Sequence, residues 1–120
     1  MAIDFTKELG VHPQALALRA QRTEVLASNI ANESTPGYQS RDVDFAQALS
    51  QVAGEAGDGL ALDTDAGMKY RVPYHARLDG NTVELGVEQA AFSQNVSDFQ
   101  TSLTFVNMKL KGLAKAIEGQ

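Results

Sequence analysis

The chain contains no cysteine and no tryptophan, and only three of its 120 residues are proline. Without cysteine it can form no disulfide, thiolate metal site or thiol nucleophile. Its net charge is −5 with no basic cluster, which gives no electrostatic basis for binding nucleic acid or an anionic membrane. No window approaches 18 consecutive apolar residues, so we expect no transmembrane helix and no direct membrane insertion. The N-terminus also lacks the cationic start and apolar run of a cleaved signal peptide.

Side chains in patterns suited to catalysis or metal binding are also scarce. His12 and His75 lie far apart in the sequence and show no metal-ligand spacing. The run 63–67 begins like a calcium loop but places glycine where a ligand is required. A hydrolase that pairs His75 with Asp79 has no supporting pattern. We therefore expect no enzyme, with no catalytic residue, no metal and no cofactor.

The most informative stretch is 88–117. Apolar residues recur there at alternating steps of four and three: Phe92, Val96, Phe99, Leu103, Val106, Leu110, Leu113 and Ile117. This heptad spacing predicts a helix with one apolar stripe, about 38 Å long, that faces partner helices. The polar residues of its first part are nearly all uncharged, which indicates that more than one side of the helix is covered.

A second helix is predicted over 13–31. Smaller residues repeat the same spacing on one face: Leu16, Ala20, Thr23, Ala27 and Ile30, and Leu26 widens this stripe. Small residues opposite large ones allow two helices to approach closely, so we expect this helix to pack against the C-terminal one. The opposite face carries Arg19, Gln21, Arg22 and Glu24, a pattern typical of a solvated surface.

The middle of the chain reads as shorter elements. Asn29 and Asn32 suit the left-handed conformation that often ends a helix. Pro36 followed by Gly37 predicts a type II turn, in which the glycine takes a positive φ. A short helix is expected over 44–52, with Ser40 as a possible N-cap, although Asp42 or Asp44 would serve as well. The acidic, glycine-rich run 53–67 predicts a flexible loop.

Residues 68–87 have strand character. Asp79 and Gly80 lie between two such runs, 76–78 and 82–85, and predict a β-hairpin. The expected fold is mainly α, with long terminal helices in a coiled-coil-like hairpin around an irregular or short β-hairpin segment. We divide this single structural unit into 1–52, 53–86 and 87–120.

One run of residues carries a specific resemblance. The stretch 26–38 closely resembles the N-terminal signature of bacterial flagellar axial proteins, the rod, hook and hook-associated subunits. Its matching residues are Ser28, Asn29, Ile30, Ala31, Asn32, Thr35, Pro36, Gly37 and Tyr38. Further similarity follows at 41–45, 70–73, 78–83, 87–88, 102–105 and 111–113, and the whole pattern is most similar to basal-body rod proteins of the proximal rod.

This resemblance implies a structural subunit of the proximal rod. Such subunits assemble helically through terminal coiled-coil helices, transmit motor torque and are required for motility. They are exported unfolded by the flagellar type III apparatus and lie on the periplasmic side of the basal body. The implied partners are other copies of the chain, other rod subunits and the MS-ring adaptor FliE. The alternative is a soluble helical adaptor or export regulator that binds one partner through the same apolar stripe.

Overall fold

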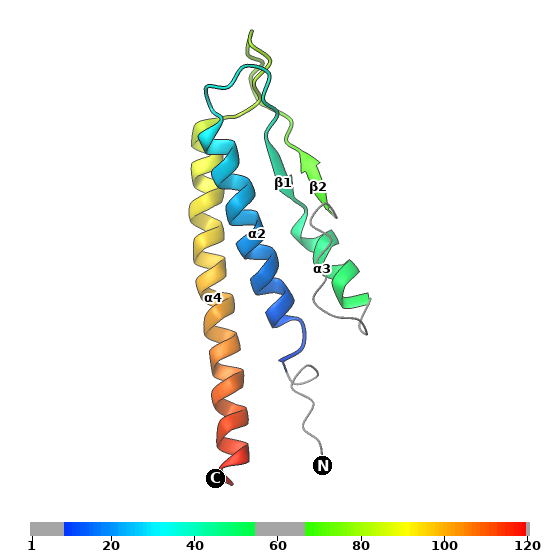
Figure 1. The fold of residues 1–120 in the computed structure, drawn as a ribbon, viewed down its shortest axis with the longest axis vertical. Coiled ribbons are helices and arrows are strands. Elements are labelled where there is room, and N and C mark those ends of the chain that lie inside the picture. Colours follow the sequence, from blue (N-terminus) through cyan, green and yellow to red (C-terminus); the bar gives the residue numbers. More distant parts are fainter. Residues whose placement is uncertain (1–8, 55–66, 120) are drawn as a thin grey trace.

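The computed structural model describes residues 9–54 and 67–119. In chain order, the elements are α2 (His12–Ala31), β1 (Arg41–Val43), α3 (Phe45–Gly54), β2 (Met68–Tyr70) and α4 (Leu85–Ile117). The molecule measures 64 × 26 × 18 Å. Helix α2 lies between α4 on one side and the two strands with α3 on the other (Figure 1). The predicted mainly α fold with long terminal helices and a small antiparallel sheet is confirmed.

Helices α2 and α4 run antiparallel, and three contacts define their register. The rings of His12 and Phe105 stack with their centroids 5.9 Å apart. One turn or more further along, Arg19 contacts Asp98 at 3.2 Å, and the Asn95 amide donates to the Thr23 hydroxyl at 2.8 Å. Beyond Phe105, about three turns of α4 extend past the start of α2.

The face that α4 turns toward α2 differs from the predicted stripe. Half of the stripe, including Phe92, Phe99 and Val106, is partly buried, but the other half is exposed: Val96, Leu103, Leu110 and Ile117. The inward positions between the partly buried residues are polar, and both Glu88 and Asn95 are fully buried. The helix is rotated because these polar side chains find hydrogen-bond partners on α2.

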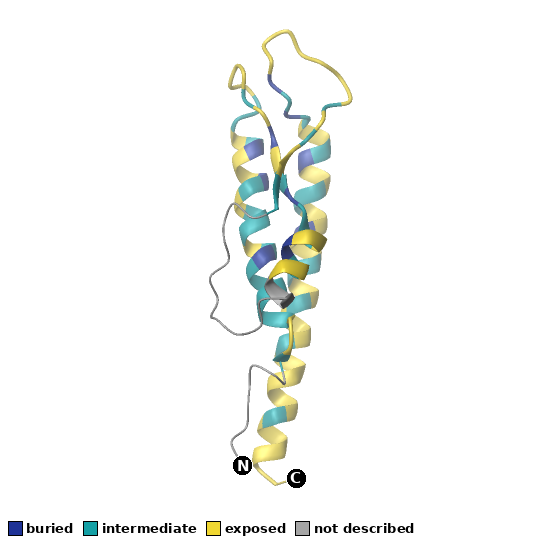
Figure 2. Cartoon of the chain, turned by 90° about the vertical axis from the view of Figure 1, so that its right-hand side faces the viewer, coloured by how far each residue is buried: buried dark blue, intermediate teal, exposed yellow. Residues whose placement is uncertain are grey.

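The predicted stripe on α2 is likewise rotated. Ala20 and Ala27 are exposed, whereas Leu18, outside the predicted stripe, is buried. Leu26, predicted to widen the stripe, is buried as expected. The apolar core is small and lies between α2, the sheet and α3, in the part of the molecule remote from the termini (Figure 2). Its members are Leu18, Val43 and Ala48, with Val25, Phe45, Leu49 and Met68 packed around them.

The β-hairpin predicted at Asp79 and Gly80 is wrong. A turn does form, with the Gly80 N–H bonded to the Arg77 carbonyl, but neither 76–78 nor 82–85 is a strand. The residues after the turn pair instead with the loop that follows α2, where the Thr82 N–H donates to the Tyr38 carbonyl at 2.9 Å. Of the loop predicted over 53–67, residues 55–66 lie outside the described part of the chain.

The two strands come from segments that are distant in sequence. They pair antiparallel, with Arg41 opposite Tyr70, Asp42 opposite Lys69 and Val43 opposite Met68. The helix predicted over 44–52 is confirmed as α3. Of the three candidate caps, Asp44 caps it, since its carboxylate accepts from the Gln47 N–H at 3.2 Å, whereas Ser40 is separated from the helix by β1. Ser40 is instead buried against Thr82.

Leu26 tests the packing of α2, because its side chain has no exposed surface. Replacing Leu26 with Ala is expected to lower the free energy of unfolding by about 3 kcal/mol, through lost burial and the cavity left behind. The exposed Leu103→Ala is the matched control and should cost much less. Urea unfolding followed by far-UV circular dichroism measures both, and equal losses would contradict the described packing.

Candidate assembly site

The loop after α2 begins with a helix end that needs no left-handed residue. The Asn32 N–H donates to the carbonyls of Ser28 and Asn29, and Asn32 has φ −102°, so the predicted left-handed asparagine is wrong. The predicted Pro36-Gly37 turn is confirmed. Gly37 has φ +74°, and the N–H of the next residue, Tyr38, donates to the carbonyl of Thr35 at 3.3 Å.

Asn29 ties this loop to the rest of the molecule. Its amide nitrogen donates to the Arg41 carbonyl at 2.6 Å and to the Glu88 carboxylate at 3.0 Å. Its amide oxygen accepts from the Arg41 N–H at 3.1 Å and from the Tyr38 hydroxyl at 3.2 Å. A fully buried amide thus has all its groups bonded, and it joins α2, β1 and α4 at one point.

The second asparagine of the motif acts only locally. Asn32 donates to the Ser28 carbonyl and accepts from the Thr35 hydroxyl at 3.1 Å. Pro36 is exposed at the turn, and Ala31 is exposed at the end of α2. Of the motif residues, the structure therefore brings Ser28, Asn29 and Tyr38 together, with the Ser28 and Tyr38 hydroxyls 3.2 Å apart.

Asn81 holds the same loop from the other side, a role that its sequence context did not reveal. Its buried amide nitrogen lies within 2.8–3.0 Å of the carbonyls of Asn32, Glu33 and Thr35. Its oxygen accepts from the Val83 N–H at 2.7 Å. A backbone bond from Gly37 to the Asp79 carbonyl completes the junction.

A chain of four charges lies beneath the motif, and each comes from a different segment. Arg22 of α2 binds both carboxylate oxygens of Asp42, on β1, at 2.9 and 3.0 Å. Arg71, directly after β2, donates to Asp42 at 2.8 Å and to Glu88, on α4, at 2.9 Å. Glu88 is fully buried, and the other three side chains are about one-fifth exposed. The negative charges of two carboxylates and the positive charges of two guanidiniums therefore cancel in a site that is largely closed to water.

The electrostatics follow from this arrangement. Burial disfavours the charged form of Asp42, but hydrogen bonds from Arg22 and from the Val43 N–H, with the charge of Arg71, outweigh it, so its pKa lies below the usual range. The hydrogen bond to Asp42 in turn raises the pKa of Arg22. Arg22 was expected on a solvated face. Its burial was missed because its partners lie on segments that sequence periodicity does not connect.

Arg19 also departs from the expected solvated face. Its guanidinium lies 4.1 Å from the ring centroid of Phe45 and pairs with Asp98 on α4. Its backbone carbonyl accepts from the Asn95 amide at 2.9 Å. Arg19 thus binds α4 and α3 instead of facing water, whereas Glu24 of the same predicted face is exposed as expected.

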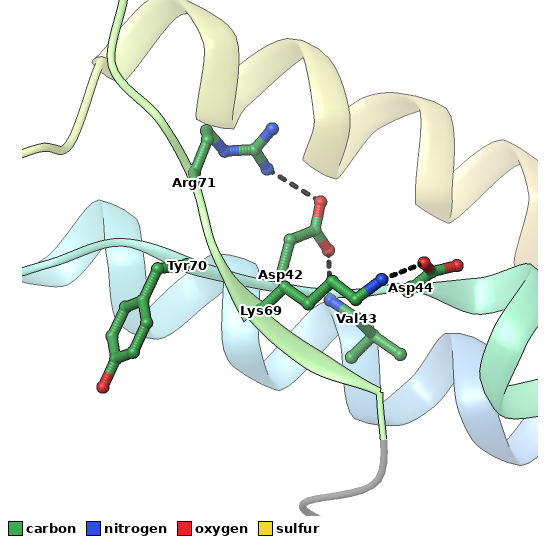
Figure 3. A pocket seen from close by; sticks show the side chains of 6 residues that line it. All are labelled: Asp42, Val43, Asp44, Lys69, Tyr70 and Arg71. Carbon is green, nitrogen blue, oxygen red and sulfur yellow. Dashed lines mark hydrogen bonds and ion pairs between the residues drawn. The ribbon is translucent and has the colours of Figure 1, made fainter.

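A shallow groove crosses the outer side of the two strands, lined by Asp42, Val43, Asp44, Lys69, Tyr70 and Arg71 (Figure 3). Its charged groups bond to each other: Lys69 to Asp44 at 2.7 Å, and Arg71 to Asp42. The Lys69 hydrogen bond lowers the pKa of Asp44. Tyr70 points away from the other lining residues. No charge in this groove is left for a substrate.

Within residues 9–54 and 67–119, no group of three or more histidine, aspartate or glutamate side chains is arranged to hold a metal ion. None of the described helices is long and apolar enough to cross a membrane. The features that stand out are therefore the anchored motif loop and the exposed apolar line on α4.

Comparison with known proteins identifies this combination. Residues 9–39, which hold α2 and most of the motif loop, match the family model of flagella basal body rod proteins. The whole chain aligns with the flagellar basal body rod protein FlgB of Aeromonas hydrophila, at 45% identity and with 99% of that protein covered. FlgB of Salmonella typhimurium is 41% identical and that of Escherichia coli 38%, each over 88% of this chain and 89% and 88% of the relative.

These matches define the class of protein as a flagellar basal-body rod subunit. More particularly, the chain belongs to the FlgB family. The relatives are named as rod proteins, which fits the expectation that the chain is not an enzyme.

Asn29 and Asn32 make a matched pair for testing the motif. Asn29→Ala removes the side-chain partner of the Arg41 backbone N–H and carbonyl and one partner of the buried Glu88 carboxylate, so the free energy of unfolding should fall by about 2 kcal/mol. Asn32→Ala removes only local bonds at a partly exposed position and should cost clearly less. Urea midpoints compare them, and the reverse order would refute the anchoring role of Asn29.

Asp42 gives the site a defined pH dependence. Because its folded pKa is depressed, its stabilising effect is complete above the unfolded value of about 4 and is lost as the pH falls through the folded value. Asp42→Asn should lower the free energy of unfolding by about 3 kcal/mol at neutral pH. This deficit should shrink in acid, as the wild-type chain loses its own charge.

Unfolding titrations at a series of pH values would show this convergence. The control is Asp44→Asn, which breaks a more exposed ion pair directly after β1 and should give a smaller deficit. A deficit for Asp42→Asn that stays constant down to strongly acidic pH would contradict the assignment.

Proposed function

We propose that the chain is a structural subunit of the proximal rod that polymerises helically through α2 and α4. The rod then transmits motor torque, and motility depends on it. The observation that carries this proposal is the half of the α4 stripe that α2 leaves uncovered. Membership of the FlgB family supports the rod as its setting.

The exposed line on α4 has the chemistry of a helix–helix contact. Val96, Leu103, Leu110 and Ile117 recur at intervals of seven residues and are 36%, 39%, 44% and 60% exposed. Heptad-spaced apolar residues along one side of a helix pack into a neighbouring helix, and a continuous apolar surface of this kind marks an interaction site. Since α2 occupies an adjacent side of α4, the partner helix comes from another subunit.

The proposed partners follow from the rod setting. They are other copies of this chain, other rod subunits and, at the base, the MS-ring adaptor FliE. During secretion the unfolded chain engages the flagellar type III export apparatus and reaches the periplasmic side. No reaction is catalysed in this role. The residues of the motif loop support it by fixing the position of α4 relative to α2.

A soluble adaptor or export regulator remains the second candidate, because one partner helix would cover the same exposed line. Location distinguishes the two. A rod subunit co-purifies with intact basal bodies, whereas an adaptor forms a complex of defined size in the cytosol.

Leu103 tests the rod proposal, since it is exposed in the subunit and central in the line. Leu103→Asp should still be secreted but should abolish rod assembly and swimming, because a carboxylate cannot be buried in an apolar contact without a partner. Secreted protein, basal bodies and spreading in soft agar would be measured. Phe99→Asp is expected to have the same effect, with a cost to the subunit itself.

Thr101→Asp is the matched control. This exposed residue lies on roughly the opposite side of α4, only two positions away, and its hydroxyl bonds within the helix. It should leave assembly intact. Normal swimming in Leu103→Asp cells would count against the proposed function.

A further inference from the structure

A second exposed apolar surface lies at the end of the molecule remote from the termini (Figure 1). It consists of Val72, Tyr74 and Leu78, which we call the tip patch. Val72 is 84% exposed and Tyr74 80%, while the Leu78 side chain is entirely in solvent. Three large, exposed apolar side chains within one seven-residue segment are the kind of surface that marks an interaction site.

The backbone beneath the tip patch is held in place. The Tyr74 N–H donates to the Glu84 carboxylate at 2.7 Å. The Arg77 guanidinium donates to the Glu33 carbonyl at 3.2 Å and to the Val83 carbonyl at 3.4 Å. The apolar side chains are therefore presented from a bonded framework, which lowers the conformational cost of binding.

The two ends of the molecule carry opposite charge. Around the tip patch, Glu33, Asp79 and Glu84 outnumber Arg77, which leaves a net charge of −2. At the other end, the last turns of α4 carry Lys109, Lys111 and Lys115 against Glu118, a net charge of +2.

This lysine-bearing end of α4 is also apolar on its surface. Phe105 is 49% exposed and Met108 61%, and neither belongs to the exposed line that makes the lateral contact (Figure 2). An acidic apolar patch and a basic apolar helix end thus lie at opposite ends of one 64 Å subunit. Surfaces that are complementary but distinct give a head-to-tail contact, which repeats along a filament instead of closing.

We propose that the tip patch binds the lysine-flanked C-terminal end of α4 of the next axial subunit. The inference rests on the proposed function and adds to it a second contact, made end to end, beside the lateral contact along α4. The apolar side chains supply the burial, and the carboxylates of Asp79 and Glu84 select a helix that carries lysines.

Site-specific photo-crosslinking tests this contact in the assembled rod. A photoreactive amino acid in place of Tyr74 would be irradiated in cells, and basal bodies would be isolated and the crosslinked peptides sequenced. We expect a peptide from the lysine-bearing C-terminal helix of a rod subunit. The same probe in place of Glu24, exposed on α2, should capture different peptides.

The outcomes separate this inference from the proposed function. Basal bodies that contain the chain but yield Tyr74 crosslinks to another element, or none, would overturn the tip contact and leave the rod role standing. Absence of the unsubstituted chain from basal bodies would overturn both.

The sign of the charge provides an independent measurement. Val72→Lys and Val72→Asp remove the same exposed side chain and should leave the far-UV circular dichroism of the subunit unchanged. Against a lysine-bearing partner, Val72→Lys should reduce incorporation into rods more than Val72→Asp does. Equal losses, or a larger loss for Val72→Asp, would refute the proposed partner chemistry.

Discussion

The carboxylate of Glu88 is the point on which the subunit's architecture depends. It has no exposed surface, and it is neutralised by Arg71, which also binds Asp42, itself held by Arg22. A buried charge without a partner costs several kcal/mol. If any one of the four segments that carry these charges moved away, a charge on another segment would lose its partner at that cost. The sheet, α2 and α4 therefore dock as a unit. Through Asn29, which also binds Glu88, the motif loop is added to the same unit.

In a typical coiled coil, the apolar heptad residues lie between the helices, but here α2 covers only half of those on α4. Within the subunit, the contacts between α2 and α4 are rich in polar groups, such as Asn95 with Thr23 and Arg19 with Asp98. Such hydrogen bonds form in one register only, so they fix the alignment of the two helices. The apolar residues are divided, and half of them remain on the outer side of α4. Alignment is thus set inside the subunit, while apolar area stays available for neighbours.

Local features of the sequence predicted local structure correctly. Both long helices follow from apolar periodicity, and Gly37 adopts the positive φ that the Pro36-Gly37 pair predicts. Which faces of the helices are exposed was harder to predict, because the same heptad is compatible with two rotations of α4. The rotation that forms depends on partners on α2 such as Thr23 and Arg19. The Asp79-Gly80 signal produced its turn, but not its strands. Which segments pair depends on the rest of the fold, and here the residues after the turn pair with the loop that follows α2.

The two ion pairs of Asp42 and the pair between Lys69 and Asp44 differ in their contact with solvent. Lys69 is 60% exposed and Asp44 35%, so dissolved ions reach this pair and weaken it as ionic strength rises. The cluster beneath the motif is largely closed to those ions. A rise in ionic strength therefore weakens a surface ion pair of this subunit while leaving its internal framework intact.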